Sequence, residues 1–150
     1  FGDLQCSSQV GDITRFKNFS LLCPNERETR ISLRDNESGL EKLSQKLIEF
    51  SRTERLIMKL GADGFIAYDK KTSEERKTQA FPALSANPVD VAGAGDSLLS
   101  VMATGLCSGQ SMMATSAIAC CMASIAVKKM GNSPISEKIL KAKLRDLFNS

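Results

Sequence analysis

Hydrophobic positions along the chain form short apolar runs that alternate with amphipathic stretches. The apolar run 19–23 has the length and character of a buried strand. Further along, Ser38 and Glu41 have the spacing of a capping box, and the apolar residues around them recur at helical spacing, which predicts a helix. Those apolar residues are Leu40, Leu43, Leu47 and Ile48.

The middle of the chain has the pattern of strands joined by turns. Strands are predicted over 55–60, 65–68 and 75–81. Ala62-Asp63-Gly64 is the turn between the first two, because an Asp-Gly pair tolerates positive φ. Segment 82–89 contains two prolines and is predicted to be a loop. Strands that alternate with helices favour a layered α/β fold with a largely parallel sheet.

No charged residue occurs between positions 97 and 127, a length that could suggest a membrane span. However, Ser, Thr and Gln side chains are scattered through it, and Gly105, Ser108 and Gly109 interrupt it. We therefore expect two short buried helices, 95–107 and 110–128, and no membrane segment. A last helix follows, with apolar residues on one face: Ile139, Leu140, Leu144 and Leu147.

The composition is that of an ordinary globular chain of 150 residues, with 42% hydrophobic and 25% charged positions. The absence of His excludes Ser-His-Asp and Cys-His catalysis, so general-base chemistry falls to Asp, Glu, Lys or Tyr. The net charge of +3 is concentrated near the C-terminus, where Phe148 alone is aromatic. That pattern is typical of a solvated helix face, and we expect no nucleic acid as a partner.

The five cysteines are odd in number and contain no C-x-x-C pair. Three of them lie in or beside apolar sequence, where a free thiol behaves as a small hydrophobe. This usage favours a reducing, cytoplasmic setting. The sequence also opens without the pattern of a signal peptide.

The strongest local signal is Asp90-Val91-Ala92-Gly93-Ala94-Gly95-Asp96, which opens an apolar helix. The two glycines let the backbone approach a ligand, and the helix N-terminus supplies N–H groups, so the pattern predicts an anion hole. A carboxylate in the first turn suits a general base for an attacking hydroxyl. Spacing alone fits equally well a tight turn with Asp96 as the helix cap. Neither a Rossmann fingerprint nor a P-loop pattern is present.

The segment 90–96 resembles the C-terminal signature of the ribokinase-like (PfkB) sugar kinases. Residues 24–28 are similar to the P-N-x-x-E motif of that family, and 58–64 to its T-L-G-x-x-G segment. Residues 126–131 resemble the helix end that closes its adenine pocket. All four segments follow the order of the family. The opening residues 3–12 are most similar to the branch of heptose-phosphate kinases.

The resemblance implies a catalytic role for the glycine-rich segment. Asp96 would be the base that acts on the sugar hydroxyl. The backbone N–H groups of Gly93, Ala94 and Gly95 would hold the charge of the transferred phosphoryl group.

The resemblance also implies a nucleotide site for ATP. Asn25 and Glu28 would organise Mg²⁺ and phosphates through water, although an N-cap with a first-turn acid accounts for the same pair. Asp90 resembles the acid that binds a monovalent cation such as K⁺, and a strand-end Asp that caps the turn fits equally. Lys59 stands where the family usually has Thr or Ser, so an ammonium point charge replaces a hydroxyl. The residues expected to line the nucleotide are Lys59, Gly61, Asp63, Gly64 and Gly131.

The match covers the C-terminal, nucleotide-binding part of a three-layer ribokinase-like fold, in which a mostly parallel sheet is flanked by helices. Residues 1–150 contain nothing similar to the sugar-binding half or the lid of the family. We predict ATP-dependent phosphorylation of a sugar or sugar-phosphate hydroxyl. The alternative is a non-catalytic nucleotide-binding or structural fragment. The identity of the sugar is left open. Assembly into a homo-oligomer is also left open, because in this family the lid often carries the dimer contact.

Overall fold

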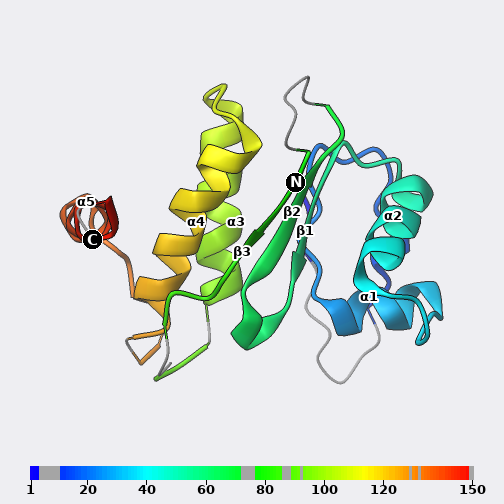
Figure 1. Ribbon diagram of the computed structural model, residues 1–150, viewed down its shortest axis with the longest axis horizontal. Helices are drawn as coiled ribbons and strands as arrows, with labels where there is room; N and C mark the ends of the chain where they lie inside the picture. Colours follow the sequence, from blue (N-terminus) through cyan, green and yellow to red (C-terminus); the bar gives the residue numbers. More distant parts are fainter. Residues whose placement is uncertain are drawn as a thin grey trace. The chain divides into compact units, whose positions relative to one another are not determined.

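The computed structural model describes residues 1–3, 11–71, 77–85, 89–91, 93–128, 130–131 and 133–148. These residues form two compact units, Phe1–Ala80 and Phe81–Ser150. The first unit contains most of the sheet and two helices, and the second contains three helices (Figure 1). The α/β class expected from the alternating pattern is confirmed.

The helices of the first unit are α1 (Glu26–Leu33) and α2 (Leu40–Ser51), preceded by a short 3-10 helix, η1 (Ile13–Arg15). Helix α2 lies where the apolar spacing predicts it, but the expected capping box is wrong. Its N-cap is Gly39, with no capping hydrogen bond from a side chain. The hydroxyl of Ser38 instead accepts a hydrogen bond from Lys46 Nζ at 3.1 Å.

Strands β1 (Arg55–Lys59), β2 (Phe65–Asp69) and β3 (Thr78–Phe81) form one sheet in that order. They confirm the three predicted strands, although positions 75–76 lie outside the described residues. Strands β1 and β2 are antiparallel because η2 (Gly61–Asp63), which joins them, is too short for a crossover. The expectation of a mostly parallel sheet is therefore not confirmed for these strands.

Parallel pairing occurs next to β1 as isolated bridges. Leu22 pairs with Leu56 on one side and with Gly2 on the other, and Asn25 pairs with Lys59. The predicted strand around Leu22 is thus reduced to a bridge. Because parallel segments end at the same edge of a sheet, the chain just after each of them converges on one edge, where ligands of open α/β sheets bind.

The core of the first unit lies between η1, α2 and the sheet. Its central side chains are almost completely shielded from solvent, and partly buried aromatic residues at 16 and 19 pack against them. The members of this core are Ile13, Leu22, Leu47, Ile48, Leu56, Met58 and Tyr68.

The second unit contains α3 (Ala94–Cys107), α4 (Met112–Ala126) and α5 (Glu137–Phe148), close to the predicted helices. Helices α3 and α4 pack closely as a hairpin (Figure 1). Gly105 permits this approach, since a Cβ atom there would lie 2.4 Å from Cγ2 of Thr115. Within the described part of the chain, we find no helix with the length and apolarity needed to cross a membrane.

Candidate functional site

Asn25 and Glu28 cap the N-terminus of α1 reciprocally. The Glu28 N–H donates to Asn25 Oδ1 at 2.7 Å, and the Asn25 N–H donates to Glu28 Oε2 at 2.8 Å. The Glu28 side chain is buried. The interpretation of this pair as an N-cap with a first-turn acid is therefore correct. It does not exclude a ligand role, because a carboxylate and an amide have more hydrogen-bonding positions than a capping box uses.

Lys59 ends β1 beside Asn25, and its side chain forms an ion pair with Asp3. Its Nζ donates to both carboxylate oxygens of Asp3, at 2.7 and 2.8 Å. Both side chains are largely shielded, with 20% of Lys59 and 18% of Asp3 exposed. Sequence reasoning missed Asp3 as a partner, since 56 positions separate the two residues.

Cys23 lies beside this ion pair and is fully buried. Burial, together with the nearby Asp3 carboxylate, raises the pKa of its thiol to about 12. Cys23 therefore stays protonated at neutral pH and packs as an apolar side chain rather than acting as a nucleophile.

The predicted turn after β1 is present. Gly61 and Gly64 have φ of 62° and 91°, in the region that favours glycine. The Leu60 N–H donates to the Gly64 carbonyl at 2.8 Å, which closes the turn. Asp63 is exposed at its tip. The predicted nucleotide-lining residues of the first unit are thus close in sequence and lie on one hairpin turn, next to the capping box.

An open cavity of about 630 Å³ lies at this edge of the sheet. It is lined by polar and charged side chains of α1 and by the end of β1; they include Asn25, Arg27, Arg30, Asn36, Lys59 and Gly61. Three of these are predicted site residues. Sequence reasoning missed Arg27 and Arg30, although both belong to α1 and Arg27 lies within the P-N-x-x-E motif.

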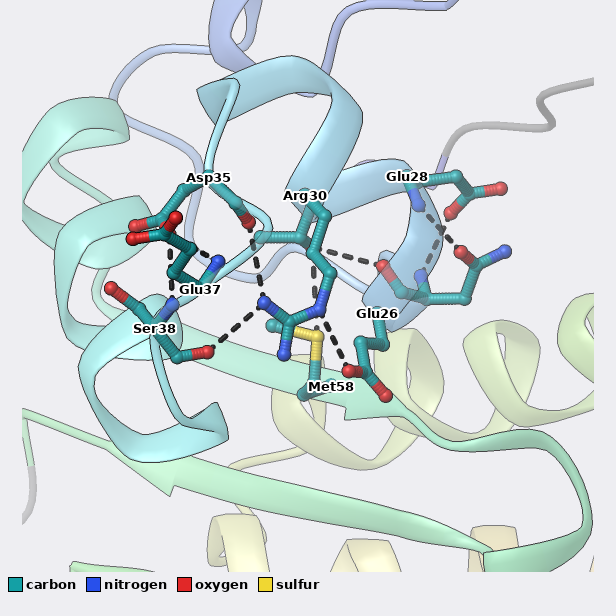
Figure 2. Close-up of polar contacts among 9 residues, drawn as sticks. Glu26, Glu28, Arg30, Asp35, Glu37, Ser38 and Met58 are labelled. Carbon is teal, nitrogen blue, oxygen red and sulfur yellow. Dashed lines mark hydrogen bonds and ion pairs between the residues drawn. The ribbon is translucent and has the colours of Figure 1, made fainter.

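Arg30 lines this cavity, and Figure 2 shows its polar contacts. Its Nε donates to Glu26 Oε1 at 2.8 Å, and its Nη1 donates to the carbonyls of Asp35 and Ser38 at 3.2 and 3.0 Å. The Asp35 carboxylate in turn accepts a hydrogen bond from Lys46, which holds the pKa of Asp35 below its usual range. The network ties the loop after α1 to both helices.

In the second unit, Gly93 is the N-cap of α3, with φ of 77°, and it has no capping hydrogen bond from a side chain. Asp96 lies in the first turn with its side chain exposed. The interpretation of Asp96 as the helix cap is therefore wrong, and the carboxylate is not used to satisfy the helix end. Of the predicted donors, the N–H of Ala94 contacts the Val91 carbonyl at 3.3 Å, a long bond that closes the turn.

Asp90 connects the glycine-rich segment to the end of α4. Its Oδ2 accepts from the N–H of Gly131 at 2.9 Å. The N–H groups of Val89 and Asp90 both donate to the Val127 carbonyl, at 2.7 and 3.2 Å. Asp90 thus bonds to a segment far along the chain. The structure brings two predicted site residues, Asp90 and Gly131, into direct contact.

The donor set fits Mg²⁺ only in a mixed coordination sphere. Among the described residues, no three His, Cys, Asp or Glu side chains group in a way that could hold a metal. Asn25 and Glu28 offer oxygen atoms, but they already cap α1. Mg²⁺ commonly keeps several waters and binds substrate phosphates, so a contact through water suits this pair.

The α/β elements, the capped helix and the glycine-initiated helix belong to a ribokinase-like fold. The chain is similar to the ribokinase of Thermotoga maritima, at 25% identity and a TM-score of 0.72 over 84% of this chain and 42% of that one. It is also similar to the Arabidopsis thaliana ribokinase solved with ribose and ATP, at 22% identity and a TM-score of 0.76, over 95% of this chain and 46% of that one.

The chain belongs to the pfkB family of carbohydrate kinases, whose family model matches residues 7–139. A curated relative, Bifunctional protein HldE of Desulfatibacillum aliphaticivorans, is 30% identical over 139 residues, which is 90% of this chain. It falls in the heptose-phosphate kinase branch that the opening residues resemble, which confirms that prediction. The chain spans 27% of the length of this relative.

Proposed function

We propose that the protein carrying this chain transfers the γ-phosphoryl group of ATP to a hydroxyl of a sugar or sugar phosphate. Residues 1–150 supply the C-terminal, nucleotide-binding part of the kinase domain. The observation that carries the proposal is the exposed Asp96 carboxylate in the first turn of α3, directly after a helix start that no side chain caps. Membership of the pfkB family supports the reaction class.

Asp96 takes the proton from the attacking hydroxyl as the bond to phosphorus forms. A carboxylate next to N–H groups that attract anions is suited to this role, because the proton must leave while negative charge develops on the phosphoryl oxygens. The N–H groups of Gly93, Ala94 and Gly95 face that charge. The start of the helix orients the N–H of Gly95, and the N–H of Ala94 exchanges its long 3.3 Å bond to the Val91 carbonyl for a phosphoryl oxygen.

The nucleotide is held by the first unit. Asn25 and Glu28 orient the phosphates through water, and bound Mg²⁺ neutralises part of the phosphate charge. Lys59, Gly61, Asp63 and Gly64 line the nucleotide on one turn. In the second unit, Gly131 lines the adenine, and Asp90 holds a monovalent cation such as K⁺ near the glycine-rich segment.

The test is Asp96→Asn in the full-length protein, assayed for ADP release with ATP, Mg²⁺ and a panel of sugars and sugar phosphates. Loss of a general base lowers kcat by about 10²–10⁴-fold. Asp146→Asn, an exposed carboxylate on α5, is the matched control and keeps normal kcat. A near-normal kcat of the Asp96 variant contradicts the assignment. ATP binding without turnover on any sugar supports a non-catalytic nucleotide-binding module instead.

A further inference from the structure

The cavity of the first unit carries an excess of positive charge. Its volume of about 630 Å³ is within the range of small-molecule sites. Arg27, Arg30 and Lys59 line it, against one carboxylate, that of Glu26. Like charges around one cavity repel each other, and a carboxylate partner or an anionic ligand relieves that repulsion.

Two of these cations already have carboxylate partners. Arg30 pairs with Glu26 at 2.8 Å, and Lys59 pairs with Asp3 at 2.7 Å. Arg27 is different: its side chain is exposed and forms no ion pair with any residue that the structure describes. Its guanidinium is therefore available to an external anion in a way that the other two are not.

The position of Arg27 is unfavourable for the helix alone. It lies in the first turn of α1, where the helix dipole disfavours a cation. The capping box already uses the N–H of Glu28, and the Asn25 carbonyl accepts from the N–H of Thr29 at 3.1 Å. The charge of Arg27 therefore does not help to cap the helix. A residue that breaks a local rule without a structural gain is expected where function requires it.

We propose that Arg27 binds a phosphate group of a substrate in this cavity. The guanidinium is planar, stays charged and can donate two parallel N–H bonds to phosphate oxygens. Asn25 and Asn36, which also line the cavity, supply amide donors. The inference rests on the proposed function, since it assigns a phosphate contact to the substrates of that reaction. The phosphate belongs either to the nucleotide or to a sugar phosphate.

The test is calorimetric titration of the protein with sodium tripolyphosphate and, separately, with glucose 6-phosphate. Arg27→Gln lowers the affinity for the phosphate that the residue binds by about tenfold, the effect of losing one charge-assisted contact. Arg27→Lys lowers this affinity by less, because lysine keeps the positive charge but cannot donate two parallel N–H bonds. The matched control is Arg15→Gln, an exposed arginine outside the cavity, which binds like wild type. Thermal unfolding verifies that each variant is folded.

The outcomes separate the two sources of phosphate. A loss for tripolyphosphate alone assigns Arg27 to the nucleotide, and a loss for glucose 6-phosphate alone assigns it to the sugar phosphate. Equal affinities of wild type and Arg27→Gln for both probes overturn the inference, as does the absence of binding of either probe to the folded protein. If Asp96→Asn abolishes kinase activity but Arg27→Gln leaves the affinity for both probes unchanged, the proposed function stands and this inference fails.

Discussion

Replacing Gly105 by alanine tests the close packing of α3 against α4. A Cβ atom at position 105 would lie 2.4 Å from Thr115 Cγ2 and 2.8 Å from Thr115 Oγ1, so one of the helices must shift. Thr115 cannot move away easily, because its side chain is buried and its hydroxyl donates to the Ser111 carbonyl at 2.8 Å. Alanine in an open helix position would stabilise by about 1 kcal/mol relative to glycine. Overpacking costs about 1–3 kcal/mol, and contacts this short belong at its upper end.

We therefore expect Gly105→Ala to lower the free energy of unfolding by about 1–2 kcal/mol, the overpacking cost less the helix propensity gained. The decisive control is the same substitution in a Thr115→Ala background. That background removes both contacting atoms and leaves only the Thr115 Cβ position, 3.2 Å away. There, Gly105→Ala becomes neutral or stabilising.

Urea denaturation followed by circular dichroism measures all four proteins, and the double-mutant cycle gives the coupling between the two positions. The reasoning is refuted if Gly105→Ala stabilises the wild type, or if it destabilises both backgrounds equally. Because Asp96 lies in the first turn of α3, a shift of this helix also moves the proposed base, so kcat is expected to fall together with stability.

Two further predictions concern the capping box and the buried thiols. Asn25→Ala removes a helix cap and lowers the free energy of unfolding by about 1 kcal/mol, whereas Asn25→Asp keeps the cap. If the Asn25→Asp variant is normally stable but binds ATP more weakly, the Asn25 amide contacts the ligand. Unchanged ATP affinity of that variant contradicts this role. Iodoacetamide at pH 8, with peptide mapping by mass spectrometry, modifies the exposed Cys107 and spares Cys23 and Cys120, because burial raises their thiol pKa values to about 12 and about 11. Between pH 9.0 and about 12 the unfolded thiols have lost their protons while the folded protein retains them, so the free energy of unfolding falls as pH rises. Cys23→Ala reduces the slope of this dependence. A free energy of unfolding that does not change with pH in this window would contradict the burial argument.

Two predictions failed, one because other side chains bond to Ser38 and one because the short turn predicted between two strands already excludes a parallel pairing of those strands. Ser38 and Glu41 have the spacing of a capping box, yet the Ser38 hydroxyl accepts from Lys46 and its carbonyl accepts from Arg30. The alternation of strands and helices favoured a parallel sheet, yet the short turn at η2 forces β1 and β2 to be antiparallel. In both cases the local pattern is present in the sequence, but the residue or strand that it pairs with in the structure differs from the expected one.

Interactions over a few residues were determined by the sequence itself. The apolar spacing predicts α2, the break at Ser108 and Gly109 separates α3 from α4, and Asp63-Gly64 marks the turn after β1. Each of these depends on backbone preferences and on side chains within one or two helical turns, so position along the chain is enough to deduce them.

Contacts between distant segments were decided only by the tertiary structure. The Lys59–Asp3 ion pair, the bond from Gly131 to Asp90 and the contact of Gly105 with Thr115 join residues whose types would suit many other partners. Among the described residues, Glu26 and Asp3 pair with two of the cations that line the cavity, and Arg27 is left available to a ligand. Which charge has a partner and which is left for a ligand depends on distances in space, and a single sequence does not contain those distances.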